Sequence, residues 1–194
     1  MPSDFPTLHT PRLLLRAFAL ADVPHLVALA GNYEVAKNTL NIPHPYDVED
    51  ACRWVQFTQD HYAQQTGYAF AVELRATGAF IGGAGLTVDR RFDRAEAGYW
   101  LGQPYWGQGL ASEALAALLR YGFAELTLNK IYATHLATNP ASGRVMLKNG
   151  MVKEGELVQH TKRDGQYHDL WQYRLTRTEH AQLANYCRLQ IADI

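Results

Sequence analysis

The stretch Tyr105–Phe123, YWGQGLASEALAALLRYGF, joins a loop with two glycines to a long helical pattern. Apolar residues then recur at helical spacing, which predicts a helix that begins near Gly109 and buries one face. The first amides of such a helix have no intrahelical acceptor and lie at the positive end of the helix dipole. Glycines before the helix allow a bulky anion to approach the backbone closely. The stretch therefore predicts a phosphate-binding loop.

Composition describes a globular chain without a strong electrostatic bias. The 194 residues are 47% hydrophobic and carry 18 Lys plus Arg against 19 Asp plus Glu, a formal net charge of -1. Such a chain can bury a full core, and we expect one domain over residues 1–194. The charge balance argues against nucleic-acid and anionic-membrane partners. The basic pairs Arg90–Arg91 and Lys162–Arg163 are interpreted as solvated turn residues.

Cysteines and histidines give no metal or disulfide pattern. Cys52 and Cys187 lie far apart on amphipathic helical patterns, and the eight histidines show no metal-ligand spacing, so we expect no metal. The N-terminal segment has no signal-peptide pattern, and no apolar run is long enough for a membrane span. These features predict a cytoplasmic protein without a membrane partner, and leave a monomer or a homodimer equally open.

Helical and strand-like patterns alternate along the chain without an internal repeat. We expect helices at 23–30, 33–37, 48–65, 109–123, 141–150 and 178–188, and strands at 12–18, 68–75, 79–89, 95–102, 130–137, 151–162 and 167–176. Asp22 and Asp47 are the predicted N-caps of two helices. The short links between the three central strands suit antiparallel hairpins. The order predicts an α+β fold with a mixed, mostly antiparallel central sheet flanked by helices.

Other phosphate-binding motifs do not fit the glycine loop. No Walker A string occurs, which argues against nucleoside triphosphate chemistry. A dinucleotide fingerprint would require a third glycine where Ser112 stands, and an acidic residue at the end of the next strand, KIYATHLATN, which has none. The glycines at 82–85 lie inside a strand and indicate a bulge or close packing. What remains is a pyrophosphate held by backbone amides beside an antiparallel sheet.

Two motifs resemble the GNAT superfamily of N-acetyltransferases, and most closely its RimJ and RimL branch, which acetylates ribosomal-protein N-termini. They are EAGYWLGQPYWGQGLASEAL at 96–115 and NPASGRVMLKNGM at 139–151, and the similarity extends from TPRLLLRAF at the front to EGELVQHTKRDGQYHDLWQYRL near the end. The superfamily loop reads Arg or Gln, two residues, Gly, one residue, then Gly or Ala. Trp106 occupies the first position, as is usual in this branch, while Gly109 and Ala111 fit the other two.

The resemblance implies a GNAT fold, with a V-shaped splay between the strands near 95–102 and 130–137, and acetyl-CoA as the donor. It places the pyrophosphate on the amides from Gly107 to Ser112, the pantetheine beside Tyr99–Leu101, and polar contacts to the pantetheine at Asn139 and Ser142. The implied cofactor-binding residues are Tyr99, Trp100, Leu101, Trp106, Gly107, Gln108, Gly109, Leu110, Ala111, Ser112, Asn139 and Ser142. Read without the resemblance, Asn139 suits a helix cap, and Trp100 and Trp106 suit core aromatics.

Acetylation of an amine requires a general base to deprotonate the ammonium. Strand alternation places Glu96, Gly98 and Trp100 on one face, with open space at Gly98 beside the carboxylate. Glu96 is therefore a candidate base, acting directly or through a water, although a strand glutamate in a hydrogen-bonded pair is an equal alternative. His135, on a later strand, is the rival base because histidine titrates near neutral pH; a structural histidine is the alternative there.

The same chemistry requires a proton donor to the thiolate and hydrogen-bond donors to the oxyanion. Ser142 is the candidate donor to the thiolate, ahead of Tyr99 and Tyr132. A bulge near Leu101 would free backbone amides for the oxyanion.

The acceptor cleft is expected between two segments of the chain. The segments GNYEVAKN (31–38) and NIPHPYDVED (41–50) would form one wall, opposite the hairpin around residues 167–171. The candidate acceptor-binding residues are Tyr33, His44, Tyr46 and Trp171. An α-amino group has a pKa of about 7.7 to 8.0 and lysine about 10.4, so a modest base favours a protein or peptide N-terminal amine. A small-molecule amine, or a non-catalytic acyl-CoA-binding regulatory protein, is the alternative.

Overall fold

The computed structural model describes residues 5–192, which contain an eight-stranded sheet in the order β1-β2-β3-β4-β5-β6-β8-β7. Neighbouring strands are antiparallel except β5 and β6, which are parallel. The strands are β1 (Leu8–His9), β2 (Leu13–Ala17), β3 (Gly67–Leu74), β4 (Phe80–Asp89), β5 (Arg94–Leu101), β6 (Lys130–Leu136), β7 (Val152–Arg163) and β8 (Gln166–Thr176). The predicted mixed, mostly antiparallel sheet is confirmed, and only the short β1 was not expected.

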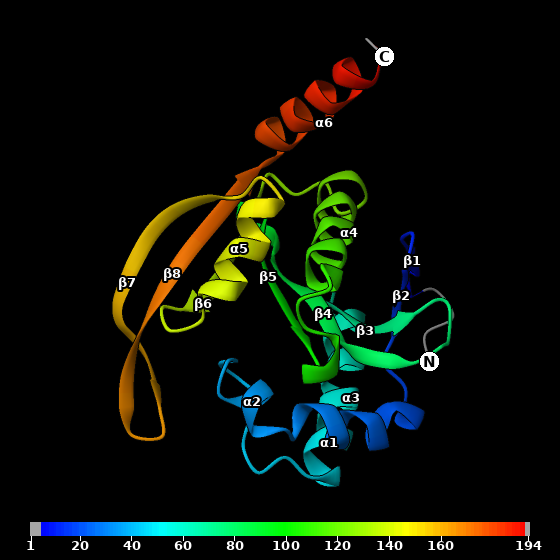
Figure 1. The fold of residues 1–194 in the computed structure, drawn as a ribbon, viewed down its shortest axis with the longest axis vertical. Helices are drawn as coiled ribbons and strands as arrows, with labels where there is room; N and C mark the ends of the chain where they lie inside the picture. The colour runs from blue at the N-terminus through cyan, green and yellow to red at the C-terminus, as the bar shows by residue number, and fades with distance from the viewer. Residues whose placement is uncertain (1–4, 193–194) are drawn as a thin grey trace.

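Helices cover both faces of the sheet (Figure 1). They are α1 (Val23–Ala30), α2 (Tyr33–Ala36), α3 (Val48–Ala63), α4 (Leu110–Ala124), α5 (Pro140–Lys148) and α6 (Arg177–Ala192). The larger core packs α4 against the sheet, and a second core packs α1 and α3 against the other face. The last helix, α6, projects away from the sheet (Figure 1) and begins one residue earlier than expected. No helix of residues 5–192 is long and apolar enough to cross a membrane.

Alternation along β5 divides its side chains between the two faces. Ala95 and Ala97 are buried in the core beneath α4. Trp100 packs against the other core, which contains residues of α1 and α3. Glu96 and Gly98 share the parity of Trp100 and therefore lie on that same face. The predicted common face of Glu96, Gly98 and Trp100 agrees with this register.

The parallel pair β5 and β6 diverges soon after it begins. Residues 94–96 of β5 pair with 130–132 of β6, whereas β5 continues to Leu101 and β6 to Leu136. This is the V-shaped splay that the family resemblance implied. The pairing of β5 with β4 runs from Arg94 to Leu101 without a shift, so the expected bulge near Leu101 is absent from this ladder. The edge of β5 that faces β6 is instead freed by the splay.

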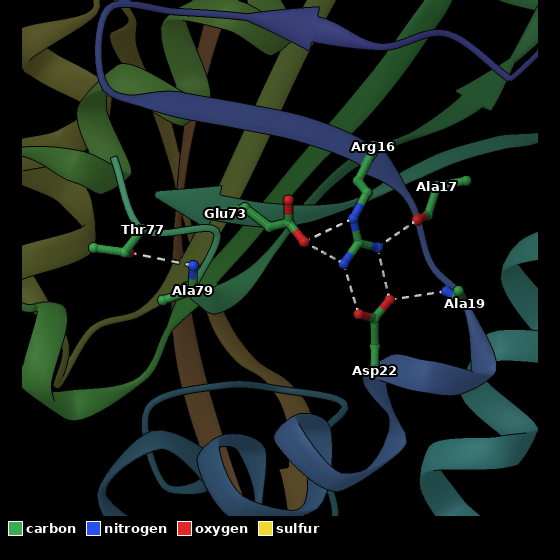
Figure 2. Close-up of polar contacts among 7 residues, drawn as sticks. All are labelled: Arg16, Ala17, Ala19, Asp22, Glu73, Thr77 and Ala79. Carbon is green, nitrogen blue, oxygen red and sulfur yellow. Dashed lines mark hydrogen bonds and ion pairs between the residues drawn. The ribbon is translucent and has the colours of Figure 1, made fainter. Parts of the chain in front are cut away.

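Asp22 does not cap α1 through its side chain, contrary to the prediction. Its buried carboxylate accepts two hydrogen bonds from the Arg16 guanidinium, at 2.8 and 2.7 Å, and one from the Ala19 amide at 2.8 Å (Figure 2). Arg16 also donates to Glu73 on β3. An ion pair with a guanidinium stabilises a buried carboxylate more than a single capping hydrogen bond from a helix amide would. Asp47, in contrast, caps α3 as predicted.

Candidate active site

A cleft of about 1080 Å³ lies where β5 and β6 diverge. Residues from both faces of the sheet line it. From the α4 side come Gly107, residues 109–112 and the first turns of α5, and from the α3 side come residues 38–43 and one stripe of α3. The splay therefore joins two half-sites into one continuous space.

The glycine loop presents a row of free backbone amides to this cleft. The first backbone bond at the start of α4 runs from the Glu113 amide to the Gly109 carbonyl, at 3.1 Å. None of the described residues accepts a hydrogen bond from the amides of residues 107–112. Gly107 and Gly109 have φ of +74° and +76°, a left-handed conformation that strains other residues. This geometry fits a bound pyrophosphate, as the sequence predicted.

Two side chains hold the glycine loop in place. Trp106 donates from its indole Nε1 to the Leu101 carbonyl at 2.7 Å, which ties the loop to the end of β5. Arg12 donates to the Gln108 carbonyl at 3.0 Å and pairs with Glu113 at 2.6 Å. Trp106 thus has a structural hydrogen bond where the superfamily motif has Arg or Gln. The clamp by Arg12 was not predicted, because it joins positions far apart in sequence.

Tyr99 and Ser142 meet across the splay. The Tyr99 hydroxyl lies 2.9 Å from Ser142 Oγ and donates to the Ser142 carbonyl at 3.0 Å. Burial raises the pKa of Tyr99, and the contact with Ser142 lowers it by less. Asn139 caps α5 by accepting from the Ser142 amide, and its side-chain amide donates to the Asn38 carbonyl at 3.2 Å. Asn139 therefore performs the predicted cap and also joins the two halves of the cleft.

Glu96 lies in the cleft on the α3 side of the sheet. Its Oε1 accepts a hydrogen bond from Thr134 Oγ1 at 2.8 Å, and the second oxygen has no partner among the described residues. Gly98, two residues along the same face, is exposed, and a Cβ added there would meet nothing within 4 Å. The predicted open space beside a carboxylate is therefore present, and Thr134 orients that carboxylate.

His135 lies on the opposite face of β6 from Thr134. Its side chain is only 4% exposed, and its ring stacks on Tyr173 with 5.6 Å between centroids. Nδ1 donates to the Leu136 carbonyl at 2.7 Å, so the neutral ring has its lone pair on Nε2, which has no hydrogen-bond partner among the described residues. Burial lowers the pKa of His135 and outweighs this hydrogen bond, which raises it. His135 is thus a neutral, buried histidine beneath α5, close to Gly143.

Of the four candidate acceptor residues, Tyr46 alone lines the cleft. Burial, aided by the negative charge of Asp50, raises its pKa to about 12. Tyr33 and His44 pack ring against ring at 5.2 Å outside the cleft. Trp171 shares the parity of Tyr173 on β8, which turns it toward the α5 face, where Lys153 lies 3.6 Å from its ring centre. Strand parity explains this last difference, since the acceptor half is on the other face.

Two contributions to the site were not predicted. The cleft-facing stripe of α3 includes Trp54, Phe57 and His61, none of which was predicted from the sequence to be a site residue. Arg163, interpreted as a solvated turn residue, instead donates to the carbonyls of Ala36 and Thr39, the latter at 2.7 Å. These hydrogen bonds join the tip of the β7–β8 hairpin to the end of α2 and the residues after it (the hairpin strands and α2 are labelled in Figure 1). The hairpin therefore does face the 31–38 segment, but through Arg163.

Within residues 5–192 no group of three His, Cys, Asp or Glu side chains could hold a metal ion. Cys52 is a half-buried free thiol, and the side chain of Cys187 lies outside the described residues.

Comparisons with known proteins agree with this geometry. The family model described as an acetyltransferase (GNAT) domain matches residues 12–152. A Bacillus licheniformis protein named uncharacterized N-acetyltransferase p20 is 35% identical over 176 residues, which are 90% of this chain and 98% of that protein. The ribosomal-protein-serine acetyltransferase of Escherichia coli is 28% identical over 135 residues, 63% of this chain and 75% of that protein.

Among solved structures, the ribosomal L7/L12 α-N-protein acetyltransferase RimL in complex with coenzyme A has a TM-score of 0.81 at 21% identity, over 88% of this chain and 98% of its own. The chain belongs to the GNAT acetyltransferase family. It is accordingly an acetyl-CoA-dependent acyltransferase of the N-acetyltransferase class.

Proposed function

We propose that this protein transfers the acetyl group of acetyl-CoA to the α-amino group of a protein or peptide, with Glu96 as the general base. One observation carries the proposal: a single cleft joins the free amides of the glycine loop to the Glu96 carboxylate through the splay. An anionic donor and a cationic acceptor would thus approach from opposite faces of the sheet. Positive backbone groups and a negative carboxylate complement those charges.

The donor half has groups suited to each part of coenzyme A. The amides of residues 107–112 suit the pyrophosphate, and the exposed cations Arg144 and Lys148 on α5 line the same cleft. The free edge of β5 beyond Glu96 suits the pantetheine and, near the thioester, the oxyanion. The Ser142 hydroxyl is the proposed donor to the departing thiolate, with Tyr99 holding it in place.

The contacts of the two candidate bases favour Glu96 over His135. Thr134 holds one oxygen of Glu96, the other has no partner among the described residues, and the space at the neighbouring Gly98 is open. His135 also lines the cleft, but it is buried on the face opposite Glu96, with Gly143 of α5 next to its Nε2. A base must come within hydrogen-bond reach of the proton that it removes. The acceptor half of the cleft meets this condition at Glu96.

An N-terminal amine is the proposed acceptor because its pKa is lower than that of a lysine side chain, so a carboxylate base removes its proton more readily. An α-amino group loses its proton near pH 8, about two units below lysine. The relative from Escherichia coli, a ribosomal-protein-serine acetyltransferase, supports the same class. A small-molecule amine of similar basicity is the second candidate, because the α3 half of the cleft is partly apolar.

Two measurements test this proposal. The first measures the free thiol released when the protein is incubated with acetyl-CoA and each amine of a panel. If no amine gives thiol release above the blank, the protein is a non-catalytic acyl-CoA-binding protein instead. The second uses mass spectrometry on a peptide with one free α-amine and one lysine. We expect acetylation at the α-amine, and a product modified mainly on lysine would refute the N-terminal assignment.

A further inference from the structure

The floor of the acceptor half of the cleft is built from residues with almost no side chain. Gly85 of β4 lies directly opposite Gly98 of β5, and Ala69 of β3 lies directly opposite Gly85. These residues line the cleft together with Gly83. Gly83 has no room for a side chain, because an added Cβ would lie 2.8 Å from Trp100 Nε1. Trp100 thus covers Gly83, and the small residues Ala69, Gly85 and Gly98 on three adjacent strands form the floor beside Glu96.

Aromatic rings form the wall above this floor. On α3 the rings of Trp54 and Phe57 stack with 5.5 Å between centroids, and Phe57 and His61 are 3.9 Å apart. Phe18, on the chain after β2, meets Trp54 edge to face at 6.0 Å. All four residues line the cleft, and Phe57 is 48% exposed there. Exposed aromatic side chains inside a concave site are typical of a surface that receives an apolar ligand.

The charged residues around this pocket differ in whether they form an ion pair. Asp50 and Arg53 also line the cleft, but they pair with each other, and Arg53 pairs with Glu49 as well. Glu96 has the neutral Thr134 as a hydrogen-bond partner and forms no ion pair with a described residue. The pocket therefore has the Glu96 carboxylate at one end and the aromatic wall beside it, while its other charged residues, Asp50 and Arg53, are paired with each other.

We propose that the acceptor amine carries a bulky, planar apolar group next to the nitrogen, and that this group lies on the small-residue floor against Phe57 and Trp54. The inference rests on the proposed function, and it narrows the substrate class. The group is the side chain of an aromatic N-terminal residue, or the ring of a free arylalkylamine. A serine side chain, such as the named substrate of the Escherichia coli relative bears, would leave the aromatic wall exposed to water.

The test compares matched amines. Peptides that differ only in a first residue of Phe or Ser form one pair, and phenethylamine with ethylamine forms the other. We expect kcat/KM to favour the aromatic member of each pair by about 10-fold or more, the range that apolar pocket contacts supply. A preference in the peptide pair alone identifies a peptide acceptor, and one in the amine pair alone identifies a small molecule. Equal rates in both pairs, or a preference for Ser and ethylamine, overturn the inference.

Variants locate the preference in this pocket. Phe57→Ala should lower kcat/KM for the Phe peptide much more than for the Ser peptide, and so remove most of the aromatic preference. Phe92→Ala is the matched control, because Phe92 is 54% exposed at the β4–β5 turn and does not line the cleft. Gly98→Val, which fills the floor, should exclude the bulky amine selectively. Equal losses for both peptides in Phe57→Ala would contradict the proposed contact.

A binding measurement separates this inference from the proposed function. Phenethylamine should quench tryptophan fluorescence of the CoA-loaded protein, and Phe57→Ala should weaken this binding about 10-fold. If the protein binds phenethylamine but acetylates no amine, the enzymatic proposal fails and the pocket assignment stands. If it acetylates amines but binds phenethylamine no better than ethylamine, the pocket assignment fails alone.

Discussion

The Tyr99 hydroxyl lies 2.9 Å from Ser142 Oγ, and this contact joins β5 to α5, the helix after β6, beyond the point where β5 and β6 stop pairing. The two hydroxyls share the side of the sheet that also carries the glycine loop. Because burial raises the pKa of Tyr99, its phenol stays protonated and acts as a fixed donor. With the Tyr99 proton donated to the Ser142 carbonyl, the Ser142 proton can turn from the Tyr99 oxygen toward a thiolate.

Ser142→Ala should therefore lower kcat by about 10²-fold, the usual effect of losing a proton-transfer partner, with the KM for acetyl-CoA nearly unchanged. Steady-state kinetics with acetyl-CoA and the amine varied in turn measures both. Tyr99→Phe is the matched variant and should have a smaller effect. A larger loss in Tyr99→Phe than in Ser142→Ala would assign the donor role to the tyrosine.

Removing the carboxylate base should separate turnover from donor binding. Glu96→Gln keeps the shape of the side chain and its contact with Thr134, and should reduce kcat by about 10² to 10⁴. Calorimetry should show unchanged acetyl-CoA affinity. Glu156→Gln is the control, since Glu156 is exposed and pairs with Lys153 outside the cleft. Loss of activity in His135→Ala but not in Glu96→Gln would transfer the role to histidine.

A side chain at Gly109 should block the phosphate site. Gly109→Trp places a ring beside the free amides and should weaken CoA binding at least about 10-fold by calorimetry, because the pyrophosphate can no longer reach them. Gly165→Trp controls for backbone strain: Gly165 has φ of +79° at the β7–β8 turn and open space around it. Equal CoA affinity in the two variants would refute the loop assignment.

Arg163 should fix the position of the segment around residues 36–39, which lies beside the acceptor half of the cleft. Its guanidinium reaches the Ala36 and Thr39 carbonyls from the hairpin tip, so Arg163→Ala should raise the KM for the amine several-fold and leave the KM for acetyl-CoA unchanged. Lys162→Ala is the control, because Lys162 is exposed over the Tyr167 ring. Matching rises in both KM values would indicate a general loss of structure instead.

The buried His135 predicts a loss of stability in acid. Burial lowers its pKa below the ordinary 6.5, so the unfolded chain binds the proton more readily. Stability from this group is fully present above about pH 6.5 and is lost as pH falls toward the lower folded pKa. Urea unfolding from about pH 7.5 to about pH 5.5 should show a smaller loss for His135→Phe than for the wild type. His160→Phe, at an exposed position, should retain the wild-type loss.

Local sequence determined the elements of this protein closely. Apolar spacing placed α3, α4 and the strands within a few residues, since each buries one periodic face. The glycine loop was predictable for the same reason: free amides and permissive φ are properties of adjacent residues. Strand parity also placed Glu96 beside the open space at Gly98. Asp22 was misassigned because its ion pair with Arg16 requires the packed chain.

Tertiary structure alone decided which residues meet in the cleft. Trp171 was predicted to bind the acceptor, yet strand parity turns it toward α5. Phe57, which the sequence did not single out, lines the acceptor half from α3. Arg163 has the sequence pattern of a solvated turn residue, but in the folded chain it donates a hydrogen bond to the Thr39 carbonyl. Periodicity along the chain fixes on which face of a helix or strand a side chain lies. Contacts between residues more than 100 positions apart depend instead on how the splay and the hairpin arrange those elements in space.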